Sequence, residues 1–203
     1  MRPTNKSMKR LSLYLFLILF TFQTPSQADD IRDFQIEGMS VGDSLLDHFS
    51  EEEIESSIRN YHKDHTFKTA DMYSSEFNIY DGVQAMFKQD DRKYIIHGLI
   101  GVTFYENNIE ECYAKKDEIF LEMKKLFKNA VIDDRGSYSH PVDITGKSKV
   151  TAVYFEFKSK DYAQIKCFDW SKDREVTERD TDTLRVGLLT GELGYWLTNV
   201  AYN

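Results

Sequence analysis

Apolar residues recur at helical spacing in the second half of the chain. Residues 108–129, NIEECYAKKDEIFLEMKKLFKN, place their large side chains on one stripe and are expected to form a long amphipathic helix that Asn108 caps. The stripe consists of Ile109, Cys112, Tyr113, Ile119, Phe120, Met123, Leu126 and Phe127. The tail from Gly191 has the same spacing at Leu193, Trp196, Leu197 and Val200, which predicts a short closing helix.

Two shorter helical patterns come early in the chain. Residues 40–49 place Val41, Leu45 and Phe49 on one face of a helix that would start at an S-x-x-D cap. Residues 50–61 begin with the S-x-x-E pattern of a capping box and continue with apolar positions on another face. The pattern therefore predicts an N-terminal helix pair.

Strand patterns fill the intervals between these helices. Short runs rich in β-branched and aromatic residues, bounded by polar turns, are typical of strands. They are FKTADMY (67–73), EFNIY (76–80), VQAMFK (83–88), YIIHGLIGVTFY (94–105), VTAVYFEF (150–157), YAQIKCFDW (162–170) and DTLRVGLL (182–189). The polar stretch 133–148 and the charged stretch 169–182 are expected to be loops, and the second lacks the residue order of a calcium loop.

These elements predict an α+β fold. We expect an antiparallel sheet with the N-terminal helix pair, one long amphipathic helix and a short C-terminal helix packed on it. In the strand 162–170, alternation places Ala163, Ile165 and Cys167 on one apolar face. That face is where the long helix is expected to pack.

The first 28 residues have the pattern of a secretory signal peptide. Basic residues precede LSLYLFLILFTF (11–22), and small residues lead to a cleavage site near Ala28. An apolar run this short favours a signal over a spanning helix, which needs about 20 residues, and an uncleaved anchor is the alternative. No cysteine stands directly after the apolar run, where it could carry a lipid anchor. Residues 29–203 are therefore expected to form a single α+β domain, soluble in the periplasm, with no stable membrane anchor after cleavage.

The charge of the chain is acidic. The formal net charge is −8 over 203 residues. The signal segment contains four basic residues and no acidic residue, so its removal makes the charge −12. Nucleic acid and anionic lipid surfaces would repel such a protein, and we expect neither as a partner.

The two cysteines, Cys112 and Cys167, both follow the signal segment. A pair of cysteines in an exported chain indicates a disulfide bond. It would close a loop whose entropy contributes about 4 kcal/mol to stability. The alternative is a reactive thiol at Cys112, because a helix start favours a thiolate, but no C-x-x-C spacing supports redox catalysis.

The sequence Gly-Asp-Ser-Leu at 42–45 opens the nucleophile block of a class of serine esterases. Those enzymes take their base from a late D-x-x-H-P motif, and Ser137-x-x-His140-Pro141 here has a serine in place of the carboxylate. A nucleophilic serine needs an oriented and charge-stabilised base. We therefore expect Ser44 to be an ordinary residue of the first helix, and a hydrolase using Ser44 and His140 is the alternative.

Three histidines are candidates for chemistry. His62 and His65 have a spacing that could hold a metal on one helical turn, although H-x-x-H alone is an unspecific pattern. We expect both to be solvated. His97 lies between apolar residues of a predicted strand and is expected to be a core histidine.

A resemblance to other proteins extends over nearly all of the chain that follows the signal. It is carried by three segments, DFQIEGMSVGDSLLDHFSEEEIE, YIIHGLIGVTFYENNIEECYAKKDEI and DTLRVGLLTGELGYWLTNVAYN. They resemble a group of uncharacterised small exported proteins of marine alphaproteobacteria, and the resemblance implies no active site. More distantly, the chain is similar to small envelope-assembly lipoproteins with a β-lactamase-inhibitor-protein-like fold, an analogy of fold only.

The function that these patterns favour is binding without catalysis. We expect a soluble periplasmic protein that binds another protein or a small ligand, with a role in envelope maintenance and no cofactor. The hydrolase through Ser44 and His140 is the alternative, and a metal binder through His62 and His65 is the third hypothesis.

Overall fold

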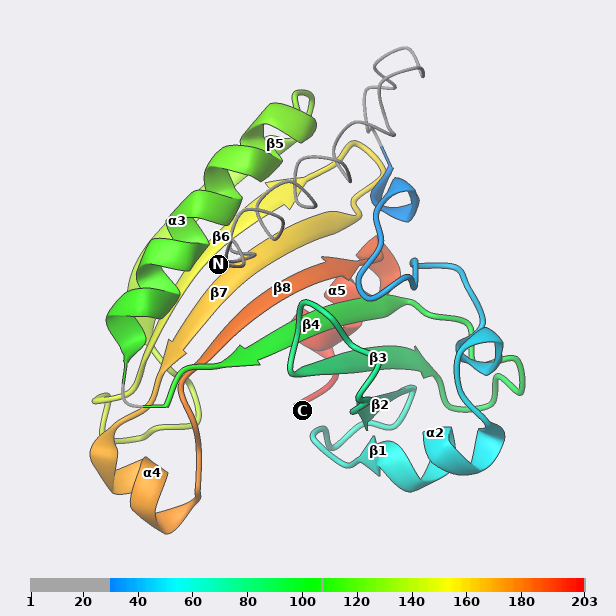
Figure 1. Ribbon diagram of the computed structural model, residues 1–203, viewed down its shortest axis with the longest axis horizontal. Helices are drawn as coiled ribbons and strands as arrows, with labels where there is room; N and C mark the ends of the chain where they lie inside the picture. Colours follow the sequence, from blue (N-terminus) through cyan, green and yellow to red (C-terminus); the bar gives the residue numbers. More distant parts are fainter. Residues whose placement is uncertain (1–29, 107, 203) are drawn as a thin grey trace, which may run out of the picture.

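The computed structural model describes residues 30–106 and 108–202. Its centre is one antiparallel sheet of eight strands in the order β1-β2-β3-β4-β8-β7-β6-β5 (Figure 1). The strands are β1 (Ile58–Arg59), β2 (Phe67–Met72), β3 (Gly82–Lys88), β4 (Gly98–Phe104), β5 (Val131–Ser139), β6 (Lys149–Glu156), β7 (Tyr162–Asp169) and β8 (Thr183–Leu189). The predicted α+β class is confirmed, and the signal segment 1–28 lies outside the described residues.

Helices and short 3-10 turns surround the sheet. They are η1 (Ile31–Asp33), η2 (Leu45–Asp47), α2 (Glu51–Ser57), α3 (Ile109–Leu126), α4 (Lys172–Thr177) and α5 (Gly191–Asn199). The predicted long helix and closing helix are thus both present as α3 and α5. None of the helices in the described part of the chain is both long and apolar enough to cross a bilayer.

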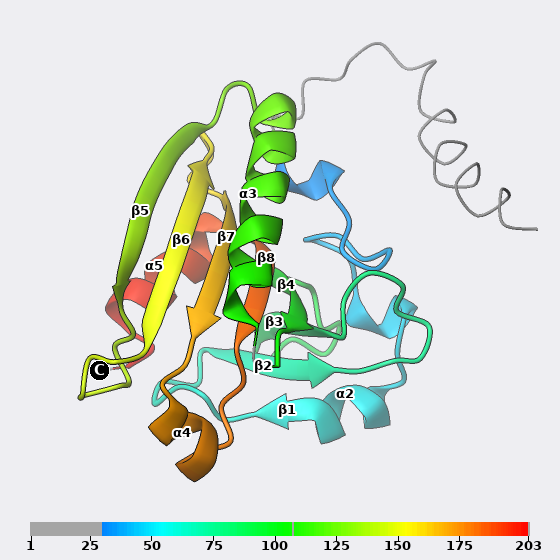
Figure 2. The same ribbon diagram turned by 60° about the vertical axis from the view of Figure 1, so that its left-hand side comes forward.

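The sheet consists of two meanders that meet at its centre. Strands β1 to β4 lie side by side in chain order, and α3 then carries the chain from central β4 to the far edge strand β5. Strands β5 to β8 return to the centre, where β8 pairs with β4 from Gly98 opposite Leu189 to Phe104 opposite Thr183. Each meander is followed by a helix, but Figure 2 shows α3 and α5 on opposite sides of the sheet.

The face of the sheet under α3, called the covered face below, holds the larger apolar cluster. Inward-facing residues of β7 and β6, such as Ile165 and Phe155, pack there with Cys112 and Phe127 from the α3 region. The segment before α2 joins the same cluster through residues such as Leu45. Alternation along the strands therefore places one set of side chains in a sealed core.

The opposite face, called the open face below, is covered only in part. Helix α5 packs Leu193 and Trp196 against Phe67, Met86 and Ile100 in a second, smaller cluster. The indole of Trp196 is 4 % exposed, and its Nε1 donates a hydrogen bond to Asp64 at 2.6 Å. Residues of β6, β7 and β8 on the rest of this face, such as Tyr154, Lys166 and Arg185, line the hollow described below.

A disulfide bond joins Cys112 of α3 to Cys167 of β7, with Cα atoms 6.1 Å apart. Both side chains are fully buried in the covered face. The predicted disulfide and the predicted packing of the long helix on the face of Ala163, Ile165 and Cys167 are confirmed. A disulfide bond fits an oxidising compartment.

The predicted helix over 40–49 is wrong, and so is the N-terminal helix pair. Only the second member forms, as α2 with the capping box of Ser50 and Glu53. The first is a turn with Gly42 at φ +100°, followed by the short η2. Its backbone bonds to a distant segment instead: Gly42 N–H donates to the carbonyl of Ile96. Long-range pairing overrides the local helical spacing here.

The predicted strand at 76–80 is also wrong. The carboxylate of Glu37 accepts hydrogen bonds from the backbone N–H groups of Asn78, Ile79 and Tyr80 at 2.7–2.9 Å. These donors therefore do not pair with a neighbouring strand, and the segment forms a loop across the end of the sheet.

Two segments that were expected to be loops contain regular secondary structure. The stretch 133–148 begins inside strand β5, and the charged connector 169–182 contains the short helix α4. Strand β5 is an edge strand with a bulge between Asp134 and Gly136, where Gly136 has φ +57°. Polar side chains and a bulge are common on edge strands because they discourage pairing with another chain, and they also hide the strand pattern.

Candidate functional site

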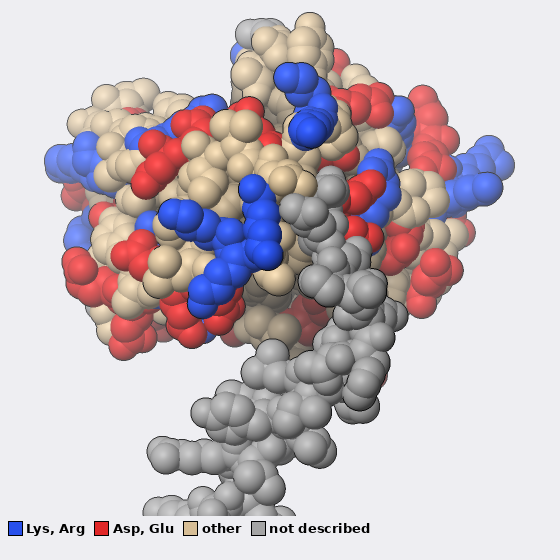
Figure 3. All heavy atoms as spheres, turned by 90° about the horizontal axis from the view of Figure 1, so that it is seen from above, with Lys and Arg blue, Asp and Glu red and all other residues tan. Residues whose placement is uncertain are grey.

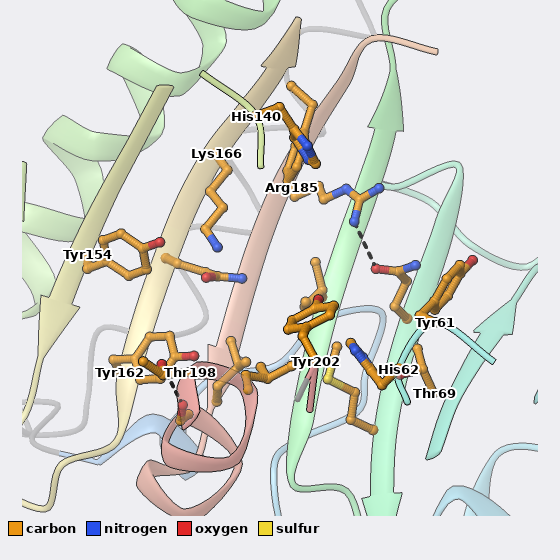
Figure 4. Close-up of a pocket in the computed structure, with 18 of the residues that line it drawn as sticks. Tyr61, His62, Thr69, His140, Tyr154, Tyr162, Lys166, Arg185, Thr198 and Tyr202 are labelled. Atoms are coloured by element: carbon orange, nitrogen blue, oxygen red, sulfur yellow. Dashed lines mark hydrogen bonds between the residues drawn. The ribbon is translucent and has the colours of Figure 1, made fainter. Parts of the chain in front are cut away.

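A hollow of about 770 Å³ lies on the open face, bounded by strands β2 to β8, helix α5 and Tyr202 (Figure 4). Its volume is in the range of small-molecule sites, about 300–1,000 Å³. Strand β7 contributes Tyr162, Gln164, Lys166 and Phe168 to it. These residues alternate with the ones that β7 buries under α3, so the hollow follows from the strand pleat.

Two cations, Lys166 and Arg185, stand at the centre of the hollow. They are directly opposite each other on β7 and β8. Both are partly buried, and burial together with the neighbouring charge of Arg185 lowers the pKa of Lys166 to about 8. Burial also lowers the pKa of Arg185. Among the described residues, no carboxylate lies within ion-pair distance of either cation.

A chain of hydrogen bonds fixes the position of Arg185. Its Nη1 donates to Oε1 of Gln84 at 3.2 Å, and Nε2 of Gln84 donates to Oδ1 of Asp71 at 2.9 Å. The other oxygen of Asp71 accepts from the hydroxyl of Tyr61. Figure 4 shows the guanidinium of Arg185 turned toward this chain. Because Asp71 is two side chains away, it orients Arg185 without an ion pair.

Aromatic rings form the walls around the cations. The guanidinium of Arg185 lies 4.4 Å from the ring centre of Phe168, and Nζ of Lys166 lies 5.1 Å from that of Tyr154. Such contacts stabilise a desolvated cation by about 0.5–2 kcal/mol. Burial raises the pKa of the Tyr162 hydroxyl to about 12 and raises that of Tyr154 further. Both phenols are therefore neutral hydrogen-bond donors at physiological pH.

The floor of the hollow beside the two cations contains a buried acceptor. Gln164 is 3 % exposed, and its Oε1 has no hydrogen-bond partner among the described residues. Beside it, neighbouring side chains pack closely over Gly187: a Cβ there would stand 2.9 Å from Ile100 and 3.2 Å from Nε2 of Gln164. The missing side chain of Gly187 thus lets Gln164 and Ile100 pack against strand β8.

Two other basic residues of the hollow lie near its rim and are paired, and a third, Lys160, is exposed. Nε of Arg174 is 2.7 Å from Asp180, and Nε of Arg135 is 2.8 Å from Asp133. On the face seen in Figure 3, acidic and basic side chains are likewise interspersed. Lys166 and Arg185 differ from the other cations of the hollow because they are partly buried and have no carboxylate within ion-pair distance among the described residues.

The residues of the hydrolase hypothesis are placed in separate environments. The hydroxyl of Ser44 donates to the carbonyl of Lys93 at 2.5 Å and caps η2, in the segment that packs against the covered face. His140 lines the hollow on the open face, where its ring lies 4.4 Å from that of Trp170. Its Nδ1 accepts from the N–H of Val142. The geometry gives the hydrolase hypothesis no support.

Of the other candidate histidines, His62 and His97 pack against aromatic rings, so the expectation that His62 is solvated is wrong. His62 lies in a loop against Trp196 and Tyr202, and burial lowers its pKa. His65 is exposed. His97 is partly buried against Phe67, with a lowered pKa for the same reason. Within residues 30–106 and 108–202, no group of three His, Cys, Asp or Glu side chains is arranged to hold a metal ion.

Sequence reasoning missed the hollow, although a signal was present. Gln164, Lys166 and Arg185 are polar residues within otherwise largely apolar strands. A lysine and an arginine in the interior of two strands are rarely buried without a purpose. Only the pairing of β7 with β8 shows that the two cations are neighbours.

Comparison with models of protein families, with curated proteins and with solved structures finds no match to this chain.

Proposed function

We propose that the protein is a non-catalytic, exported binding protein that holds a small ligand in the hollow of the open face. One observation carries the proposal: a sheet with one sealed face leaves, on the other, a hollow of about 770 Å³ walled by aromatic rings. Ligand sites are concave, mostly apolar and supplied with a few fixed polar groups. Lys166, Arg185 and Gln164 are such groups.

Export and a role in the cell envelope are part of this proposal. The basic and apolar pattern of residues 1–28 supports export, and the disulfide bond between Cys112 and Cys167 agrees with an oxidising compartment. Tyr154 and Tyr162 can donate hydrogen bonds to a bound ligand, since their pKa values are raised by burial. Binding through preformed side chains needs no nucleophile and base in contact.

The experiment is a fluorescence titration with N-phenyl-1-naphthylamine, a neutral two-ring dye that brightens in apolar surroundings. We expect saturable binding to the wild-type protein. Thr198 lies on α5 and lines the hollow (Figure 4), so Thr198→Trp should fill part of it and weaken dye binding about tenfold. Thr198→Ala is the matched control and should bind as the wild type does.

The outcomes separate the hollow from other sites. Dye binding that Thr198→Trp leaves unchanged would place the dye elsewhere and contradict the proposal. Trp170 supplies a second readout, because it lines the hollow whereas the only other tryptophan, Trp196, is buried between α5 and the sheet. Dye bound in the hollow should quench the emission of Trp170, and Trp170→Phe should remove most of that quenching.

A further inference from the structure

The chemistry of the ligand can be inferred from the two central cations, and this inference rests on the proposed function. Lys166 and Arg185 face each other on neighbouring strands without a carboxylate partner among the described residues, whereas Arg174 and Arg135 at the rim each have one within 2.8 Å. Lys166 and Arg185 are thus partly removed from water without an anionic partner among the described residues, and this arrangement has room for a negative group from outside.

The cost of this arrangement points in the same direction. Taking a cation out of water without a partner is unfavourable, and the lowered pKa of Lys166 reflects that penalty. The rings of Tyr154 and Phe168 offset it only in part. An anion between the two cations would offset it far better, because charge-assisted hydrogen bonds are about twice as strong as neutral ones.

We propose that the hollow binds a small organic anion, whose oxyanion group lies between Lys166 and Arg185 and whose ring packs against Tyr154 and Phe168. The planar guanidinium of Arg185 suits two oxygens of a carboxylate or a phosphate, and Lys166 adds a point charge. Gln84 holds Arg185 in place before the ligand arrives, which reduces the entropy lost on binding. The free Oε1 of Gln164 accepts a hydroxyl or N–H group of the same ligand.

The occupant is a small molecule for two reasons. Helix α5 and Tyr202 close one side of the hollow, so an extended chain cannot run through it along the strands (Figure 4). The formal net charge of −8 disfavours long polyanions, which would meet repulsion beyond the two cations. Carboxylates and phosphate monoesters share the required chemistry.

The test uses a matched pair of dyes. The dye 8-anilinonaphthalene-1-sulfonate has the two ring systems of N-phenyl-1-naphthylamine plus one anionic group. We expect the wild-type protein to bind the anionic dye about tenfold more tightly than the neutral one. Equal affinities, with both dyes bound in the hollow, would overturn the anion proposal and leave the proposed binding function standing. Failure of both dyes to bind would contradict the proposed function itself.

Three variants locate the anion. Lys166→Met and Arg185→Met should each remove most of the preference for the anionic dye, measured as the ratio of the affinities of the two dyes for the same variant. Arg185→Lys keeps the charge without the planar fork and should retain part of the preference. Lys158→Met removes a cation from the exposed turn between β6 and β7 and should change nothing. A preference that persists in both methionine variants would place the anion elsewhere.

Competition then identifies the oxyanion. Benzoate and phenyl phosphate should displace the anionic dye from the wild-type protein, and the more effective one shows whether a carboxylate or a phosphate fits the pair. Benzyl alcohol has the ring without the charge and should not compete at the same concentration. Equal competition by benzyl alcohol would show that the ring alone is recognised and would refute the role of the two cations.

Discussion

The two faces of strand β7 are built from neighbouring residues and differ in almost every property. On the covered face, Ile165 and Cys167 are fully buried and Cys167 is bonded to α3. On the open face, Gln164, Lys166 and Phe168 line a hollow and include a cation with no ionic partner among the described residues. One residue along the chain thus separates a position that stabilises the fold from one that destabilises it.

This difference shows how a small sheet can support a binding site. The apolar cluster under α3 and the disulfide bond stabilise the sheet from one side, so the unfavourable placement of Lys166 and Arg185 on the other side is tolerated. Helix α5 completes the second side only at one end. Substitutions in the apolar clusters and substitutions at the two central cations should therefore affect stability in opposite directions.

The largest effect is expected at the covered face. Replacing Cys112 and Cys167 by alanine should lower the free energy of unfolding by about 4 kcal/mol, because the disulfide bond restrains a long loop of the unfolded chain. Chemical denaturation of the double variant and of the wild-type protein measures this change. Thiol titration of the denatured, unreduced wild-type protein should detect no free thiol; two free thiols would mean that the covered face is held by packing alone.

A slightly smaller loss is expected where α5 covers one end of the open face. Trp196→Ala removes a buried indole and should destabilise the protein by about 3 kcal/mol, at the lower end for large aromatic residues because the end of the chain can relax. Tyr195 is the matched control: it lies on the same helix but is 69 % exposed, so Tyr195→Ala should change little. Similar melting temperatures for the two variants would show that α5 contributes no core.

A gain in stability, and not a loss, is expected from a substitution in the hollow. Without ligand, Lys166→Met should stabilise the protein near neutral pH by on the order of 1 kcal/mol, since it removes an unpaired and partly buried cation. Differential scanning calorimetry of the variant measures the gain. Lys158→Met, at an exposed turn, is the control and should have no such effect. Destabilisation by Lys166→Met would mean that the cation supports the fold.

The gain should depend on pH. The pKa of Lys166 is lowered to about 8 in the folded protein, and an unfolded lysine titrates at about 10.4. Below pH 8 Lys166 is protonated in both the folded and the unfolded protein, and the folded protein bears the full cost of the buried charge. Between pH 8 and about 10.4 Lys166 is protonated only in the unfolded protein, so the stability of the wild-type protein rises with pH. Arg185, Arg135 and Tyr154 are ionisable groups close to Lys166, from β8, β5 and β6, and the advantage of Lys166→Met should shrink from pH 8 to 10.

The elements of the fold that follow from local patterns could be predicted from the sequence. The stripe of α3, the hairpin of β6 and β7 and the closing helix α5 each have a period that packing reinforces. The segment 40–49 shows where this reasoning fails, because Gly42 and its neighbours bond to residues 94–96. Strand β5 fails for another reason: an edge strand with a bulge has a mostly polar pattern.

The hollow could be predicted only in fragments. Each of Lys166, Arg185 and Gln84 is visible as a polar residue within an apolar strand. Their proximity depends on the order of the strands, since Gln84 and Arg185 are separated in space by β4 and in sequence by about half the chain. Sequence motifs instead drew attention to Ser44 and His140, which lie in different parts of the fold.

The smallest effect is expected at Ser44, which tests whether the segment packed on the covered face carries any chemistry. Its hydroxyl donates to the carbonyl of Lys93 and accepts from Leu46 N–H, so Ser44→Ala should cost about 1 kcal/mol through lost hydrogen bonds. A fluorophosphonate probe should not label the wild-type protein, because no base activates the hydroxyl and His140 lines the opposite face. Labelling that Ser44→Ala abolishes while the fold persists would make the covered face the catalytic one and reverse the comparison.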